Sequence, residues 1–467
     1  MRSRCLTVVV VAALLACPAA EVPAQLAPSA VAPGPSTPAV ASLRMGALLP
    51  LTGSGAWFGA EIKQGLDLAA AELNPTPKRG EVTSESGRAA FGPADRKESR
   101  DETGPRSTTS APAAGRGAAP QSAGTPTTAT PSAESVEPSD QRREVALVVQ
   151  TANVQPLDVK DAETEFAKLL GSGVVAIVTA SPTPTLTVYP LASGRDVLVL
   201  HAGLATERFP ATSRTLLQLR PSVAARADVL GAHAWERGIR RLAVLTGGDT
   251  FGRAVRAAVS ARWRQRGGHL AHEETVSLDA SDLPSRLHAV ARLGPEAVVL
   301  GYQGAELGQA ARALRDAGFA GQILAADDDR GALLAGGRAL DGALIMSDAF
   351  VPIPGTRGAR FARAYEAHYG QAPSRFAASA YEAATLLATA GERVVLNGRS
   401  LTGSRLRDIL VTERRFPSLS AGELIVRDDG TIGRPLALFR VDRDRLAFET
   451  YVGVDGAALP PPQGSTP

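Results

Sequence analysis

Short apolar runs rich in β-branched residues recur through most of the chain, and segments of helical period separate them. The runs cover residues 144–149, 174–179, 196–200, 241–246, 296–302 and 321–327. Between the first two runs, residues 158–173 repeat apolar side chains at helical spacing. Continuous apolar strands that alternate with helices are typical of parallel sheets covered on both faces. The pattern predicts the α/β class with doubly wound sheets, and the number of strands predicts two sheets in two lobes.

Composition indicates a globular chain of more than one domain. Its 467 residues are 44% apolar and 21% charged, which is sufficient for sizeable cores. The formal net charge of +3 gives no indication of a nucleic-acid partner. The only cysteines are Cys5 and Cys17, so the expected folded region contains no disulfide or cysteine metal site. The histidines are scattered, and the close pair His269 and His272 has no third ligand nearby, so no metal or cofactor is expected.

The first residues resemble a targeting segment. Two arginines precede an apolar stretch, Leu6–Ala16, that is too short to span a bilayer. The sequence Leu-Leu-Ala-Cys ending at Cys17 is similar to a bacterial lipobox, which predicts a signal peptide over 1–16 and a lipid on Cys17. A plain secretory signal cut after Ala20 or Ala24 is the alternative. Either reading predicts export to the periplasm or the cell surface.

Three segments have the composition of disordered chain. Residues 17–42 are rich in Pro and Ala and are expected to form an extended tether. Residues 75–140 contain few bulky apolar side chains and separate one helix from the next strand, so they are expected to form a disordered insertion within a lobe. Residues 457–467 are expected to form a disordered tail.

A glycine-rich loop follows the first apolar run, as it does in nucleotide-binding proteins. Gly53, Gly55 and Gly59 lie between that run and a helical segment. A dinucleotide fingerprint requires glycine where Phe58 stands, and the Gly-Lys pair of a P-loop occurs nowhere in the chain. The Gly-x-Ser-x-Gly motif of hydrolases is also missing from the sequence. The loop is therefore expected to approach a small ligand, and the chain is not expected to be an enzyme.

Four segments together resemble one family. Their order and spacing are similar to those of the Leu/Ile/Val-binding substrate-binding proteins of ABC transporters, which have the type I periplasmic binding fold. The segments are residues 45–74, 173–209, 240–259 and 379–390. The resemblance implies two Rossmann-like lobes joined by three hinge crossovers, with the ligand in the cleft between them. Lobe 1 would comprise 43–222 and 348–420, and lobe 2 would comprise 223–347 and 421–456.

By this resemblance, one helix N-terminus in lobe 1 binds the carboxylate of the ligand. The partial positive charge and free N–H groups of a helix start favour an anion. The matching residues are Ser181, Thr183 and Thr185, although Pro182 stands where the family often has serine and removes a donor. Ordinary capping of the helix by Ser181 or Thr183 is the alternative, and the two roles are compatible.

The other lobe 1 contacts are expected from a second wall and from an aromatic corner. The second wall matches the backbone of Gly203 and the side chain of Thr206, with Ala205 at the position where the family has threonine. Trp57 and Phe58 form the corner, and two aromatic residues at a polar loop favour a ligand or a lid.

From lobe 2, the resemblance implies three further ligand contacts. Phe251 and Gln303 match cleft-facing positions at which family members carry aromatic residues. Asp327 matches an acid that accepts the ammonium group of an amino-acid ligand, and Asp328 takes that place if the alignment shifts by one residue. A solvated acidic turn is the alternative for this segment.

These features predict a lipid-anchored extracytoplasmic solute-binding protein. It would capture an amino acid or a similar small polar ligand and deliver it to the permease of an ABC uptake transporter. The departures at Pro182, Ala205 and Gln303 leave a small carboxylate, an amide or another polar metabolite equally open. The alternative function is that of a cell-envelope lipoprotein that uses the same fold to contact a partner such as a cell-wall enzyme.

Overall fold

The computed structural model describes residues 40–74, 145–204, 209 and 215–460. The predicted signal peptide, Cys17, the insertion at 75–140 and Thr206 lie outside these residues. The first strand begins at Ala41, inside the expected tether, and Leu459 N donates to Tyr451 O at 2.8 Å, inside the expected tail.

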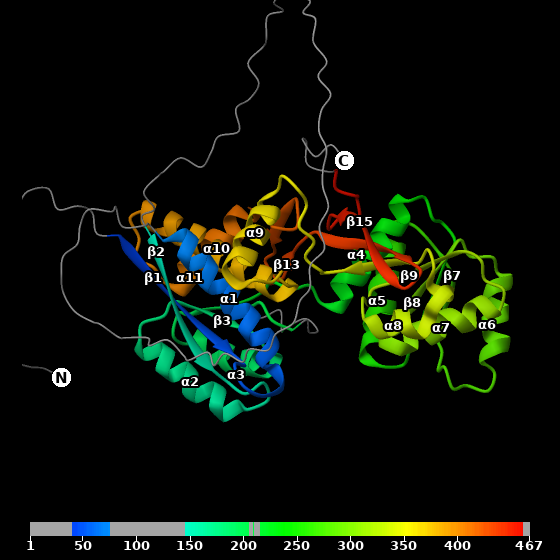
Figure 1. The fold of residues 1–467 in the computed structure, drawn as a ribbon, viewed down its shortest axis with the longest axis horizontal. Helices are drawn as coiled ribbons and strands as arrows, with labels where there is room; N and C mark the ends of the chain where they lie inside the picture. Colours follow the sequence, from blue (N-terminus) through cyan, green and yellow to red (C-terminus); the bar gives the residue numbers. More distant parts are fainter. Residues whose placement is uncertain (1–39, 75–144, 205–208, 210–214, 461–467) are drawn as a thin grey trace, which may run out of the picture. The chain divides into compact units, whose positions relative to one another are not determined.

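The first sheet has five parallel strands in the order β2-β1-β3-β4-β5 (Figure 1). Successive side chains of a strand point to opposite faces, so Met45 of β1 enters one core cluster and Leu48 enters another. The strands are β1 (Ala41–Leu49), β2 (Val145–Asn153), β3 (Ala176–Thr179), β4 (Leu198–His201) and β5 (Leu216–Gln218).

Helices cover both faces of this sheet. One face packs against α1 (Ala56–Leu73), α10 (Arg375–Leu396) and α11 (Gly403–Glu413). The other face packs against α2 (Val159–Gly171) and α3 (Pro182–Ser193). A single 3-10 turn, η1 (Gly53–Gly55), leads into α1, and α9 (Arg357–Tyr369) packs against α1 and α10.

The second sheet has the order β15-β14-β10-β9-β8-β6-β7, in which β10, β9, β8, β6 and β7 are parallel. The hairpin β14–β15 joins β10 in antiparallel orientation. The strands are β6 (Leu242–Thr246), β7 (Leu270–Thr275), β8 (Ala297–Gly301), β9 (Gln322–Ala325), β10 (Leu344–Ser347), β14 (Leu436–Asp442) and β15 (Arg445–Val452).

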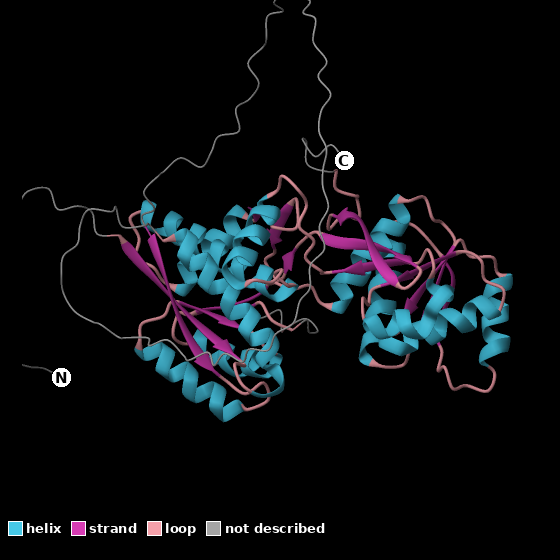
Figure 2. Ribbon diagram, in the orientation of Figure 1, coloured by secondary structure: helices cyan, strands magenta, loops and turns pink. Residues whose placement is uncertain are grey.

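Helices also cover both faces of the second sheet, as the pattern of buried strands predicts (Figure 2). One face packs against α4 (Val223–Glu236) and α5 (Thr250–Gln265). The other face packs against α6 (Leu283–Arg292), α7 (Gly304–Asp316), α8 (Arg330–Gly336) and the 3-10 turn η2 (Gly337–Leu340).

The chain passes between the two sheets three times, after β5, after β10 and before β14. A third, three-stranded sheet precedes the last passage and comprises β11 (Arg415–Pro417), β12 (Glu423–Val426) and β13 (Ile432–Gly433). Leu424, Val426 and Ile432 of this sheet belong to the core cluster of the first sheet. The expected lobe boundary at 421 therefore falls before strands that pack with lobe 1. The α/β class with two doubly wound sheets and three crossovers is confirmed.

No helix within the described ranges has the length and apolar character needed to cross a membrane.

Candidate functional site

The strand order reverses once in each sheet, and most of the expected site residues lie beside these two points. Ligands of open α/β sheets bind at such switch points, outside the carboxyl ends of the strands. In the first sheet the reversal lies between β1 and β3, and the segments that leave these strands contain Trp57 and Ser181. In the second sheet it lies between β6 and β8, and the segments that leave these strands contain Phe251 and Gln303.

A hollow is present at the carboxyl edge of each sheet. The one at the first sheet, of about 630 Å³, is lined by Ser54 and by residues 155–160. The one at the second sheet, of about 420 Å³, is lined by residues that include Asp249, Tyr302 and Glu306. The hollow at the second sheet therefore lies where the strand order reverses, whereas the hollow at the first sheet lies beside that point, between the segments that follow β1 and β2.

The start of α3 has free donors in the described part of the structure. Ser181 is the N-cap, but its side chain makes no capping bond, and its Oγ is buried without a partner among the described residues. Prolines at 182 and 184 supply no N–H, and Thr185 N already donates to Ser181 O at 3.2 Å. The first turn therefore keeps the N–H of Thr183, whose side chain is partly exposed, as its peptide donor. An anion placed here would receive donors from Ser181 and Thr183.

Thr185, expected at the ligand, uses its hydroxyl inside the protein. The side chain is fully buried, and its Oγ1 lies 2.7 Å from Thr179 Oγ1, 2.7 Å from Ser181 O and 3.0 Å from His201 Nδ1. His201 Nε2 lies 2.7 Å from Leu204 O, which can only accept, so Nε2 carries the proton and Nδ1 accepts. This network joins the α3 start to the segment after β4.

Burial lowers the pKa of His201 to about 4, because the hydrogen bond to Leu204 only partly offsets the loss of solvent and the charge of Arg220 opposes protonation. The imidazole is therefore neutral at physiological pH. In the neutral ring Nδ1 can accept a hydrogen bond while Nε2 donates to Leu204 O, so the ring holds the start of α3 next to the segment after β4.

The aromatic corner divides into an exposed and a buried ring. Trp57 is 60% exposed, whereas Phe58 is 4% exposed and belongs to the core cluster of the first sheet. The Trp57 ring lies edge-on to Phe58 and to Phe376, with centroids 5.3 Å apart in both pairs. Trp57 is therefore the ring that can reach a solute, and core packing accounts for Phe58.

In the second wall, the Gly203 carbonyl is already used. It accepts a hydrogen bond from Arg220 Nη1 at 2.9 Å. A side chain at this position would collide with Ala180, since a Cβ would lie 1.7 Å from Ala180 O, so the two loops touch at Gly203.

The lobe 2 residues occupy three different settings. Phe251 is 4% exposed and belongs to the core cluster around α4 and α5. Gln303 is exposed at the N-cap of α7. Asp327 Oδ2 accepts from Gly304 N at 2.7 Å and so binds the start of α7, while burial raises the pKa of its carboxyl. Gln303 and Asp327 thus lie at the same helix start, and Phe251 packs in the core.

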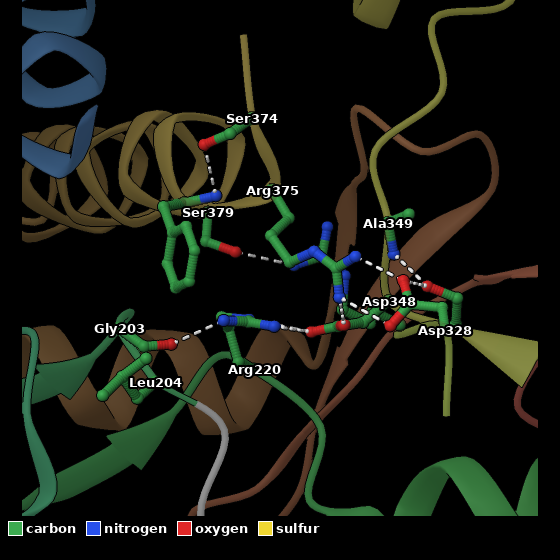
Figure 3. Close-up of polar contacts among 12 residues, drawn as sticks. Gly203, Leu204, Arg220, Asp328, Asp348, Ala349, Ser374, Arg375 and Ser379 are labelled. Carbon is green, nitrogen blue, oxygen red and sulfur yellow. Dashed lines mark hydrogen bonds and ion pairs between the residues drawn. The ribbon is translucent and has the colours of Figure 1, made fainter. Parts of the chain in front are cut away.

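A cluster of buried and half-buried charged side chains, not expected from the sequence, connects the two lobes beside these loops (Figure 3). We call it the hinge cluster, and it comprises Arg220, Asp328, Asp348 and Arg375. Asp348 follows β10 and is 6% exposed, and Arg220 follows β5 and is 4% exposed. Arg220 Nε donates to Asp348 Oδ2 at 2.8 Å, and Arg375 Nη1 donates to Asp348 Oδ1 at 2.8 Å.

Asp328 and Arg375 complete the hinge cluster across the lobes. Arg375 Nη2, from the first turn of α10, pairs with Asp328 Oδ2, which also accepts from Ser347 Oγ at 2.6 Å. Burial alone would raise the pKa of Asp328 and of Asp348, but the arginines outweigh it and hold both pKa values below their usual range. Both acids are therefore ionised at neutral pH and matched by the two arginines.

A second ion pair extends the same polar face of α10. Arg375, Ser379 and Glu382 are spaced four and three residues apart, which places them on one side of the helix. Arg434, on the third passage between the sheets, donates to Ser379 Oγ at 3.2 Å and lies 2.8 Å from Glu382 Oε2, at an angle outside hydrogen-bond geometry. Each of the three passages between the sheets thus contains one buried charged residue, and each of these residues forms an ion pair with a side chain of α10 or of another passage.

No group of three or more His, Cys, Asp or Glu residues suited to a metal ion occurs in the described parts of the chain.

Comparisons with known proteins agree with this architecture. Residues 155–445 match the family described as periplasmic binding protein. No curated protein matches the sequence.

Solved structures of ligand-binding proteins share the fold. One is a branched-chain amino acid ABC transporter periplasmic ligand-binding protein from Burkholderia xenovorans, at 14% identity and TM-score 0.60, covering 89% of this chain and 96% of that one. Another is a leucine-binding protein from Thermotoga maritima, at 17% identity and TM-score 0.51, covering 89% and 100%. A third is a solute-binding protein of an ABC transporter from Rhodopseudomonas palustris in complex with 3,4-dihydroxybenzoic acid, at 15% identity and TM-score 0.53, covering 91% and 99%.

The family match spans more than half of the 467 residues, and the two doubly wound sheets with three crossovers are the architecture that the resemblance implied. The chain therefore belongs to the periplasmic binding protein family.

Proposed function

We propose that this protein is an exported solute-binding protein that captures a small carboxylate-bearing ligand between its two lobes for an ABC uptake transporter. The proposal rests mainly on the start of α3, where Ser181 Oγ is buried without a partner among the described residues and no side chain caps the helix. A buried hydroxyl without a partner costs free energy, and a ligand carboxylate would supply the missing acceptor. Trp57 would form the apolar side of the site.

The setting of this helix start supports a ligand site. It lies at the switch point of the first sheet, and the helix N-terminus favours negative charge. Two of the three similar structures come from proteins of ABC transporters, and the ligands named for two of the three, leucine and 3,4-dihydroxybenzoic acid, both carry a carboxylate. The shared chemistry is the carboxyl group, which suits Ser181 and Thr183.

A ligand screen tests the proposal. The purified exported chain is examined by thermal shift against amino acids, amides, organic acids, sugars and amines. A ligand held between the lobes stabilises the folded state by mass action, so at least one carboxylate should raise Tm. If no compound in the panel changes Tm, solute binding is contradicted.

Transport and membrane attachment are part of the same proposal. A lipid on Cys17 and the Pro/Ala tether would hold the binding lobes near a permease. Mass spectrometry of the mature N-terminus should find a lipid-modified Cys17, and Cys17→Ser should release the protein from membranes. Capture from detergent-solubilised membranes should recover an ABC permease. Recovery of a cell-wall enzyme instead would support the envelope-partner function.

A further inference from the structure

The hinge cluster has a consequence for the kind of ligand that the site accepts. An amino-acid ligand brings an ammonium group, which requires acceptors, as well as a carboxylate, which requires donors. The acceptors and donors that remain available near the switch point of the first sheet are therefore informative. Among the described residues, most of these acceptors already have partners, whereas some of the donors have none.

The acceptors at this place are already occupied by side chains of the protein. Asp328 pairs with Arg375 and accepts from Ser347 Oγ, and the Gly203 carbonyl accepts from Arg220. Figure 3 shows Arg220 between Gly203 and Asp348, and Arg375 directed at the two acids. The two guanidinium groups thus occupy positions at which a ligand ammonium would otherwise find a partner.

The third acid, Asp327, is also partly engaged. One of its oxygens accepts from Gly304 N at 2.7 Å, as the start of α7 requires. Burial raises the pKa of this carboxyl, which makes its charged form less favourable than that of a solvated acid. It offers a weaker partner for an ammonium group than a free carboxylate would.

The polar groups without partners include donors from both lobes. Ser181 Oγ is buried without a partner in the described chain, and so is Nε of Arg226, a residue of α4 that is 7% exposed. The N–H of Thr183 lies at the start of α3 beside Ser181. The charge of Arg226 also lowers the pKa of Asp348, together with Arg220 and Arg375. Arg226 therefore keeps an N–H without a partner in the described chain, each of the three acids accepts from at least one donor of the protein, and the hydroxyls of Ser181 and Thr183 can donate to an anion.

We propose that the ligand is a small organic acid that carries a carboxylate and no ammonium group, with an apolar part that lies against Trp57. This inference rests on the proposed solute-binding function and names the class of its ligand. Arg220 and Arg375 already neutralise Asp348 and Asp328. The ammonium group of an amino acid would therefore add a positive charge next to acids that are already paired. The ammonium group would lose its hydrogen bonds to water on binding and would gain no acceptor from the protein in their place.

Matched pairs of ligands test the proposal. Isothermal titration compares leucine with 4-methylpentanoate and phenylalanine with 3-phenylpropanoate, in which only the ammonium group differs within each pair. We expect the acid of at least one pair to bind roughly 10-fold tighter than its amino counterpart, because the ammonium is buried without a partner. Equal or tighter binding of the amino acids overturns the inference while leaving solute binding intact.

Two other outcomes are distinguishable. If neither member of any pair binds, but a sugar or an amine from the wider panel does, the inference is overturned and solute binding stands. If nothing in the panel binds, both fall together.

A specificity change provides a second test. Arg375→Met removes the cation from Asp328 and frees an acceptor, so the preference for the acid over the amino acid should fall by about 10-fold or reverse. Arg375→Lys keeps the positive charge and should keep the preference for the acid. If Arg375→Met does not fold, the ratio of the two affinities is measured on Arg375→Lys instead. Arg363, an exposed residue of α9, gives the matched control Arg363→Met, which should leave the ratio unchanged. An unchanged ratio in folded Arg375→Met overturns the inference.

Discussion

The helices that follow the switch-point strands begin in opposite ways in the two sheets. In the second sheet, Asp249 Oδ1 accepts from Gly252 N at 2.8 Å at the start of α5, and Asp327 Oδ2 accepts from Gly304 N at 2.7 Å at the start of α7. In the first sheet, α3 has no side-chain cap, and Ser181 Oγ has no partner among the described residues. At its switch point lobe 2 thus satisfies both helix starts with its own carboxylates, whereas α3 of lobe 1 has no carboxylate at its start.

The difference indicates a division of labour. An anion at the start of α5 or α7 would meet a carboxylate that is already bound there, so lobe 2 is a poor anion receptor at these two places. Under the proposed function, lobe 1 binds the anion and lobe 2 closes over it. Ligand binding and stability should therefore respond differently to changes at the two edges.

The largest effect is expected at the group that holds the two edges together. Asp348→Ala removes the acid shared by Arg220 and Arg375 and leaves buried positive charge without its partner. The free energy of unfolding should fall by about 3–5 kcal/mol, measured by urea denaturation. The exposed Asp341 gives the control Asp341→Ala, which should stay within about 0.5 kcal/mol of the parent. Similar losses in both variants would show that the cluster is not an energetic link.

The next effect is the dependence of stability on pH that His201 gives to lobe 1. The pKa of His201 is about 4 in the folded protein and 6.5 when solvated, so the unfolded chain binds more protons between these values. Stability should therefore fall as the pH falls from 6.5 to about 4, by up to about 3 kcal/mol from this group. Denaturation curves of the parent and of His201→Gln should diverge in this range, with the variant less dependent on pH. Parallel curves would exclude a neutral imidazole beneath the lobe 1 edge.

A third change gives lobe 1 the cap that lobe 2 already has. Thr183→Asp places a carboxylate at the start of α3, where it should stabilise the helix by about 0.5 kcal/mol and repel an anionic ligand. Affinity for the best organic acid should fall roughly 30-fold, because like charges are brought together. Thr164→Asp, at an exposed position of α2, controls for the added charge. Unchanged affinity in Thr183→Asp would contradict binding of the ligand carboxylate at the start of α3.

A smaller effect is expected at the apolar side of the same edge. Trp57→Ala removes a ring that is 60% exposed, so stability should change little. Affinity for acids with an apolar group should fall by about 1 kcal/mol, or roughly fivefold, while short acids should be almost unaffected. An equal loss for short and long acids would mean that the ring only shapes the loop.

The sequence predicts the architecture well because buried parallel strands leave a local signal. The apolar runs at 174–179 and 241–246 correspond to β3 and β6, and the loops at both switch points carry residues expected at the ligand. The order of strands determines these points, and the right-handed crossover rule limits the orders that this succession of strands and helices can adopt.

Aromatic residues near glycine loops are harder to interpret. Phe58, Ile62 and Leu66 share one apolar face of α1, and the same spacing links Phe251 and Val255 in α5. This periodicity is visible in the sequence and favours core positions for both phenylalanines. Trp57, one residue before Phe58, lies off that face and is exposed.

The hinge cluster could not be found from the sequence. Arg220 and Asp348 are 128 positions apart, and the charges of Asp328 and Arg375 have no local pattern that selects one partner among many. Their pairing depends on the three passages between the sheets and on the polar face of α10. Only a charged residue directly after a buried strand, as at Asp348, could have drawn attention to them.

Binding of the best organic acid to Ser181→Ala and to Asp249→Ala, with unfolding measured on the same samples, tests the central claim most directly. The two variants remove one oxygen-bearing side chain from a helix start in each lobe. We predict that Ser181→Ala weakens binding roughly 10-fold with stability within about 0.5 kcal/mol of the parent. Asp249→Ala should lose about 1 kcal/mol of stability and keep its affinity. Full affinity in Ser181→Ala would contradict the claim that lobe 1 leaves this helix start for the ligand.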